Sequence, residues 1–259
     1  QGGFDRDLGR FLVTDLTDYE KYFHDATIAI GRPSAIVFAA NESDVIAALR
    51  FCKQNNLAVV PRGAGTGLSG GCVPKDGSLV LSTERMTGLQ IDAETETARV
   101  GPGVITKHLM DSAAEFGLTY PPDPASYDES TIGGNVAENA GGLRCKRFGV
   151  TKDYVIGLRA VTADGRILKT GIYNENRGFA LADVIIGSEG TLAVITEIAV
   201  RLIPTPAVGD TILVAFENPK NAAQTVSDIT RAGIVLTVME YLDGDAAACS
   251  NQYERTEGI

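Results

Sequence analysis

Apolar residues in this chain recur first at helical spacing and then in short continuous runs. Between Val45 and Cys52 they follow near-helical intervals, which predicts a helix that begins in the polar segment 41–44. The apolar run 57–60 predicts a buried strand. Directly after it, the segment 61–71, PRGAGTGLSGG, has five glycines in eleven positions. So much glycine indicates a backbone that comes close to another group.

The pattern continues with elements typical of a mixed fold of helices and sheets. It predicts a strand at 78–82, a hairpin of 89–92 with 97–100, a helix at 106–116, a hairpin around Asp164-Gly165 and a long strand at 191–203.

Pro204-Thr205-Pro206 interrupts the long strand, and we expect a domain boundary there, between residues 1–204 and residues 205–259. Beyond it, the pattern predicts a strand at 211–216, a helix at 219–232 and a strand at 234–241. Because a strand-helix-strand unit seldom stands alone, we expect the second domain to be incomplete.

Composition limits the classes of partner. With 44% hydrophobic and 22% charged residues, the chain is an ordinary globular protein. Its formal net charge of −10 argues against nucleic acid and anionic membranes, which need a basic surface. No apolar run approaches the roughly 18 residues of a membrane span, so we expect no integral membrane segment.

The cysteines are far apart and lack the spacing of metal ligands; they are Cys52, Cys72, Cys145 and Cys249. We interpret them as reduced thiols in a cytoplasmic protein, and we expect no metal site. A local basic group, Arg144, Lys146, Arg147 and Lys152, is interpreted as a surface turn, with attraction of an acidic substrate as the alternative.

The glycine-rich segment allows several interpretations. Residues 65–70 match G-x-G-x-x-G, but a Rossmann turn for a nicotinamide dinucleotide opens a helix, whereas here Asp76-Gly77 and then a strand follow. A P-loop needs Lys and then Ser or Thr after the last glycine, and the chain has Cys72. A nest of backbone N–H groups around an anion remains, with a tight turn that binds nothing as the alternative.

Two further segments combine glycine with polar side chains. The segment 130–142 contains Asn135 and Asn139, which are suited to hydrogen-bond a ligand. The segment 186–196 places Gly187 and Gly190 around Glu189. Three separate glycine clusters indicate one extended ligand.

These clusters together carry a family resemblance. The segments PRGAGTGLSGG (61–71), YPPDP (120–124), TIGGNVAENAGG (131–142) and GSEGTL (187–192) closely resemble the FAD-linked oxidases of the vanillyl-alcohol-oxidase and p-cresol-methylhydroxylase type. Within that family the chain is most similar to the group of the glycolate oxidase FAD subunit, D-lactate dehydrogenase and D-2-hydroxyglutarate dehydrogenase. The resemblance runs from about residue 22 to residue 241.

The resemblance implies an α+β fold, with a two-subdomain FAD-binding domain of the p-cresol-methylhydroxylase type followed by the start of an α+β substrate (cap) domain. It implies an FAD-dependent enzyme that oxidises a 2-hydroxy acid such as glycolate, D-lactate or D-2-hydroxyglutarate to the 2-oxo acid. Hydride then passes to the flavin while a base accepts the hydroxyl proton.

The resemblance also implies which residues hold FAD. Around the pyrophosphate they are Pro61, Arg62, Gly63, Ala64, Gly65, Thr66, Gly67, Leu68, Ser69 and Gly70. Along the cofactor they are Pro122, Asp123 and Ser126, and on the ribityl and flavin side they are Thr131, Gly133, Gly134, Asn135, Ala137, Asn139, Ala140 and Gly141. Glu189, Gly190, Ile195 and Thr196 close the site.

Many relatives attach the flavin to a histidine in the pyrophosphate loop, where this chain has Thr66, so we expect non-covalent FAD. Relatives supply the base and a metal-binding H-x-G-D-G-x-x-H type motif from a region beyond residue 259. We interpret His24 and His108 as structural or solvated, and assign no catalytic residue. The alternative to an enzyme is an FAD-binding accessory subunit that works with a partner chain; a homodimer is a further expectation.

Overall fold

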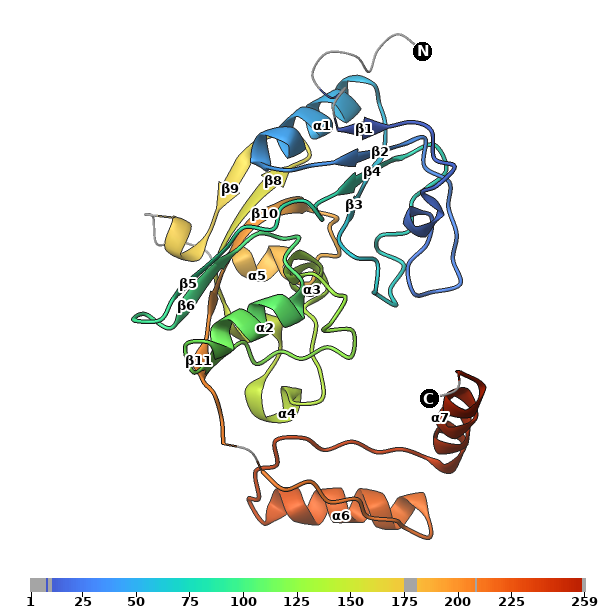
Figure 1. Cartoon of the computed structure of the whole chain (residues 1–259), viewed down its shortest axis with the longest axis vertical. Coiled ribbons are helices and arrows are strands. Elements are labelled where there is room, and N and C mark those ends of the chain that lie inside the picture. Colours follow the sequence, from blue (N-terminus) through green and yellow to red (C-terminus); the bar gives the residue numbers. More distant parts are fainter. Residues whose placement is uncertain (1–7, 9–10, 175–180, 208, 258–259) are drawn as a thin grey trace.

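Two sheets make up the main body of the protein (Figure 1). The computed structural model describes residue 8 and residues 11–174, 181–207 and 209–257. The first sheet has the strand order β1-β2-β4-β3, the second has the order β5-β6-β10-β8-β9, and β11 pairs with β7. Helices and strands are mixed along the chain, so the α+β fold class predicted from the sequence is confirmed.

The strands are β1 (Leu12–Val13), β2 (Ala35–Phe38), β3 (Val59–Arg62), β4 (Leu79–Ser82), β5 (Leu89–Asp92), β6 (Thr97–Val100), β7 (Leu118–Thr119), β8 (Val155–Thr162), β9 (Ile167–Lys169), β10 (Ala193–Arg201) and β11 (Ile203–Pro204). The α-helices are α1 (Glu42–Gln54), α2 (Thr106–Ala114), α3 (Ile132–Glu138), α4 (Cys145–Phe148), α5 (Ala182–Ile185), α6 (Pro219–Arg231) and α7 (Gly244–Glu257).

The first sheet is built around β4, which pairs in parallel with β2 and with β3. All four residues of β2 and all four of β4 are buried, as the near-continuous apolar sequences of these strands require. Helix α1 begins where the Asn41 side chain accepts a hydrogen bond from the amide of Asp44 at 3.1 Å. It contacts β4 of the first sheet and also β8 and β10 of the second, and so joins the two sheets.

The second sheet is antiparallel and has a core of its own. Apolar residues of α2 and α3 pack on it, among them Leu109 and Val136 against Leu158 and Ile198, all fully buried. Figure 1 shows α2, α3 and α5 together on one side of this sheet. The site described below lies where the two sheets and α3 meet.

Several predicted elements are confirmed. The helix α1, the hairpin of β5 and β6, and the hairpin of β8 and β9 lie where the sequence pattern placed them, with Gly165 at a φ of +77° in the second hairpin. Helix α2 ends three residues before Gly117, which has a φ of +70°. The strand predicted at 57–60 lies two residues later, as β3, and ends at the glycine loop.

Two predictions for the C-terminal part are wrong. Residues 211–216 and 234–241 are described by the structure and form no strand, whereas the helix predicted between them is present as α6. Neither segment has a neighbouring strand to pair with, and Leu213 is 100% exposed. A strand pattern needs a partner and a core before it becomes a strand. The polar end of the chain forms α7, which the sequence reasoning missed.

Figure 1 shows that α6 and α7 lie apart from the main body, connected to β11 by an extended segment. Among the described helices, none combines the length and the apolar sequence that crossing a membrane requires. The domain boundary at residue 204 stays a prediction.

Candidate functional site

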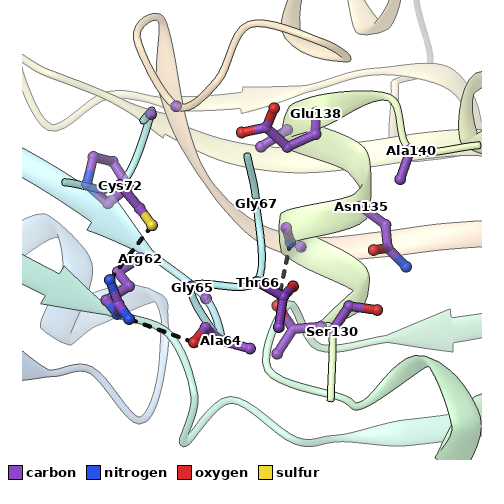
Figure 2. Close-up of a pocket in the computed structure, with 18 of the residues that line it drawn as sticks. Arg62, Ala64, Gly65, Thr66, Gly67, Cys72, Ser130, Asn135, Glu138 and Ala140 are labelled. Atoms are coloured by element: carbon purple, nitrogen blue, oxygen red, sulfur yellow. Dashed lines mark hydrogen bonds between the residues drawn. The ribbon is translucent and has the colours of Figure 1, made fainter. Parts of the chain in front are cut away.

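A pocket of about 380 Å³ lies between the glycine-rich loop that follows β3 and helix α3. Figure 2 shows the loop running from Arg62 through Gly65 and Thr66 to Gly67, alongside the helix that carries Asn135 and Glu138. The three glycine clusters of the sequence meet here, because 61–68, 130–140 and 189–195 all contribute to its wall. They are far apart in the chain, and the fold brings them together.

Most of the residues that the resemblance selected line this pocket. They are Pro61, Arg62, Gly63, Ala64, Gly65, Thr66, Gly67, Leu68, Ser126, Thr131, Gly133, Gly134, Asn135, Ala137, Ala140, Glu189, Gly190 and Ile195. The structure places the others outside the pocket wall: Ser69, Gly70, Pro122, Asp123, Asn139, Gly141 and Thr196.

The loop presents free hydrogen-bond donors. In the described part of the chain, none of the backbone N–H groups of Thr66, Gly67, Leu68 and Ser69 donates to another protein group. Several successive N–H groups without partners form the concave donor surface that binds anions. These free donors are compatible with the nest predicted from the sequence, and β4 rather than a helix follows the loop.

Steric contacts explain why two positions of the loop are glycine. Gly65 has a φ of +83°, and a Cβ atom at this position would lie 2.0 Å from Nη2 of Arg62. A Cβ at Gly63 would lie 2.3 Å from Oγ1 of Thr131, which caps α3. The backbone therefore approaches both the arginine and the start of α3 more closely than any side chain allows.

Arg62 lines the pocket, and its guanidinium binds the N-terminal segment. Its side chain is buried, and its guanidinium donates to the carbonyl oxygens of His24 at 2.6 Å and Lys21 at 2.7 Å. Nη1 also lies 3.4 Å from Sγ of Cys72, a contact drawn in Figure 2. The arginine thus holds the N-terminal segment against the loop.

Helix α3 places a polar network behind the pocket. Nδ2 of Asn135 donates to Oγ1 of Thr106 at 2.7 Å, and that hydroxyl lies 2.9 Å from Oγ of Ser130. All three side chains are buried. With its amide nitrogen engaged in this network, Asn135 has its side-chain oxygen left for a ligand.

Helix α3 was not predicted, because glycines at positions 133 and 134 hide its pattern. Its cap at Thr131, which accepts from the amide of Gly134 at 3.3 Å, is the signal that the sequence offered. Gly133 packs against Pro102 so closely that a Cβ would lie 2.5 Å from the proline ring.

Acidic side chains stand at the rim. Both carboxylate oxygens of Glu138 accept from the Ser69 hydroxyl, at 3.0 and 2.9 Å, and so connect α3 to the loop. Partial burial raises the pKa of Glu138, the nearby charges of Glu189 and Asp25 act in the same direction, and the Ser69 hydrogen bond opposes them. Glu138 therefore carries a proton more readily than an ordinary glutamate.

Three residues outside the pocket wall have other partners. Asp123 binds Arg144 at 2.7 Å, so one member of the basic group is paired in the fold. Oδ1 of Asn139, a residue with a φ of +52°, accepts from the amide of Lys152 at 2.9 Å. The hydroxyl of Thr196 donates to Glu42 at 2.8 Å, on the far side of β10 from α3.

The sequence reasoning missed other residues that line the pocket: Asp25, Gly71, Cys72, Thr83, Pro102, Pro124, Ala125, Ser130, Glu138, Ala193 and Val194. Gly71, Cys72 and Glu138 lie inside or beside the quoted motifs, so their position was a usable signal. Asp25 had no such signal, because only the tertiary fold brings its segment to the loop.

Both histidines lie outside the pocket wall. His24 and His108 are exposed and do not line it. Within the described residues, no group of three or more His, Cys, Asp and Glu side chains is arranged to hold a metal ion.

Comparison with known proteins identifies two families whose sequences match parts of this chain. Residues 33–171 match the family described as FAD binding domain, and residues 205–258 match the family described as FAD linked oxidases, C-terminal domain. The chain is 45% identical over 226 residues to glycolate oxidase subunit GlcD of Bacillus subtilis, covering 86% of this chain and 48% of the relative. It is 39% identical over 219 residues to D-lactate dehydrogenase of Archaeoglobus fulgidus, covering 82% and 49%.

Among solved structures, an alkyldihydroxyacetonephosphate synthase has the same fold, with a TM-score of 0.74 at 21% identity over 89% of this chain and 44% of that one. The chain spans about half the length of the curated relatives it matches.

Proposed function

This chain belongs to the family of FAD-binding domains, and from that premise we propose that FAD lies in the pocket between the glycine loop and α3. The observation that carries the proposal is the row of free backbone N–H groups from Thr66 to Ser69, which suits the pyrophosphate of FAD. Gly63 and Gly65 let the loop pack against Thr131 and Arg62, where a Cβ would clash. Because the chain is acidic overall, these local donors have to supply the attraction for an anion.

The proposed attachment of FAD is non-covalent. Neither histidine lines the pocket. Cys72 does line it, but burial raises the pKa of its thiol, so the reactive thiolate is scarce. Arg62 donates to the same sulfur atom and fixes its position.

The test of attachment is acid precipitation of the purified yellow protein. Flavin should pass into the supernatant, and its absorption spectrum there should match that of free FAD. Flavin that stays with the denatured chain would contradict the proposal. A protein that carries nicotinamide absorption and no flavin would overturn the cofactor assignment itself.

We further propose a reaction class: oxidation of a 2-hydroxy acid such as glycolate, D-lactate or D-2-hydroxyglutarate to the 2-oxo acid. The names of two relatives, a glycolate oxidase subunit and a D-lactate dehydrogenase, support it. FAD accepts a hydride from the α-carbon in such chemistry. The role of this chain is to bind FAD and fix its orientation. The proton acceptor is not assigned to His24 or His108, which are exposed and do not line the pocket.

A second candidate is an FAD-binding subunit that works with a partner chain. The name of the relative at 45% identity, which is that of a subunit, favours it. Anaerobic mixing of the FAD-loaded chain with glycolate or D-lactate separates the two candidates. Bleaching of the flavin by the chain alone supports the enzyme, and bleaching only after a partner is added supports the subunit.

A further inference from the structure

Asp25 is a buried acid at the wall of the proposed FAD pocket. Its residue is 4% exposed, and it lines the pocket beside the glycine loop. The next residue binds that loop directly, because the amide of Ala26 donates to the carbonyl oxygen of Gly67 at 3.1 Å. The position of Asp25 is therefore fixed relative to the donors of the loop.

The two oxygens of this carboxylate have different surroundings. Oδ1 accepts from the amide of Thr27 at 2.8 Å and from its hydroxyl at 2.6 Å. Oδ2 is buried and, within the described part of the chain, accepts no hydrogen bond. A buried carboxylate oxygen without a donor is unfavourable, so such an atom calls for an explanation.

Asp25 is also ionised at neutral pH. Burial by itself raises the pKa of this carboxyl, but the hydrogen bonds from Thr27 outweigh it and the pKa lies below its ordinary value. The nearby amide of Gly70 acts in the same direction without reaching hydrogen-bond geometry. The free oxygen is thus that of an anion, which accepts hydrogen bonds strongly.

The same turn occurs elsewhere without these features. Asp15 accepts from the amide of Thr17 at 3.2 Å and from its hydroxyl at 2.7 Å, but Asp15 is exposed and does not line the pocket. The Asp-x-Thr turn therefore forms without burial of its acid. Placement of Asp25 at the pocket is a separate property that the local turn does not require.

We propose that Oδ2 of Asp25 accepts a hydrogen bond from a hydroxyl group of FAD. A carboxylate repels phosphate, so its partner has to be a donor, and FAD carries hydroxyls on both sides of its pyrophosphate. Those hydroxyls lie next to whatever group holds the pyrophosphate, and Asp25 lies next to the loop proposed for that role. The inference rests on the proposed FAD site and adds to it a residue that binds the sugar or the ribityl chain.

The test compares Asp25→Asn with the matched control Asp15→Asn. Each substitution keeps an oxygen for the Thr hydrogen bonds and removes the charge. We expect Asp25→Asn to raise the Kd for FAD about tenfold or more, as loss of a charge-assisted hydrogen bond does, and Asp15→Asn to leave the Kd unchanged. Without FAD, both variants should still unfold in one cooperative thermal transition, which shows that the turn and the fold are kept.

Binding of ADP and of FMN identifies the hydroxyl. If Asp25→Asn weakens ADP binding, the ribose supplies the donor; if it weakens FMN binding, the ribityl chain does. A Kd for FAD equal to that of the wild type overturns the inference, and so does an Asp25→Asn protein that loses its fold without FAD. If the wild-type chain binds no FAD at all, the proposed function fails instead.

Discussion

Arg159 on β8 binds Glu42 in the first turn of α1, with Nη2 2.6 Å from Oε1. The other carboxylate oxygen of Glu42 accepts from the hydroxyl of Thr196 on β10 at 2.8 Å. One carboxylate thus connects the helix of the first sheet to two strands of the second. The pocket lies between the same two sheets, so this connection contributes to its shape.

Glu42→Gln should lower the free energy of unfolding by about 2 kcal/mol, because it removes the charge from a carboxylate whose hydrogen bonds with Arg159 and Thr196 are mostly shielded from water. Burial raises the pKa of Glu42, but the hydrogen bonds from Arg159 and Thr196 outweigh it, and the pKa lies below its ordinary value. The stabilisation is therefore present above the pKa of the unfolded chain and lost as the pH falls through the folded one. Urea unfolding at a series of pH values from neutral to acidic checks this prediction. The same pH dependence of the free energy of unfolding in Glu42→Gln and in the wild type would contradict it.

Arg62→Lys should destabilise the protein even without FAD. A lysine cannot reach the carbonyl oxygens of both Lys21 and His24, which the planar guanidinium binds together. The expected loss is about 2 kcal/mol in urea unfolding. Unchanged stability with weakened FAD binding would show instead that Arg62 contacts the phosphate, as the family resemblance implied.

FAD binding should strengthen as the pH falls. The pKa of Glu138 is raised by partial burial and by the charges of Glu189 and Asp25, so lowering the pH neutralises this carboxylate more readily than an ordinary glutamate. A neutral Glu138 repels the pyrophosphate less. The Kd for FAD measured between about pH 5 and 8 should rise with pH in the wild type and less steeply in Glu138→Gln. Equal slopes in both proteins would contradict the assignment.

The extended segment 211–216 should promote self-association. Ile212 is 83% exposed and Leu213 is 100% exposed, so apolar side chains stand next to one another in water. Sedimentation velocity over a range of concentrations should show association that Leu213→Asp reduces. Ile28→Asp, at another fully exposed apolar residue, is the matched control and should change nothing. A monomer at every concentration would count against this prediction.

Sequence reasoning located the glycine loop because that feature depends on local order, and FAD followed from the family resemblance. The strand after Asp76-Gly77 excluded the Rossmann turn, and β4 is that strand. Contacts between segments that are far apart in the chain could not be predicted from the sequence. Nothing near Asp25 in the sequence shows that Ala26 binds Gly67, and nothing near Arg62 shows that its guanidinium binds the segment before Asp25.

Glycine also concealed a helix. Helix α3 contains two adjacent glycines, which are unfavourable in helices, and it forms because Gly133 packs against Pro102 and Thr131 caps it. In the C-terminal part, by contrast, the sequence pattern predicted a strand that does not form. Residues 211–216 have a good strand pattern, but their apolar side chains have no partner, and the pattern alone does not make a strand.

Calorimetric titration of FAD into the protein free of cofactor, compared with Gly67→Ala and Gly88→Ala, tests whether FAD occupies the pocket beside the glycine loop. A Cβ at Gly67 meets no atom closer than 3.8 Å, so the variant should fold, yet the methyl group enters the space between the loop and Glu138. A Cβ at Gly88 meets nothing within 4 Å and lies outside the pocket. We expect one FAD per chain, with affinity reduced about tenfold in Gly67→Ala alone. No binding by the wild type, or equal affinity in all three proteins, would contradict it.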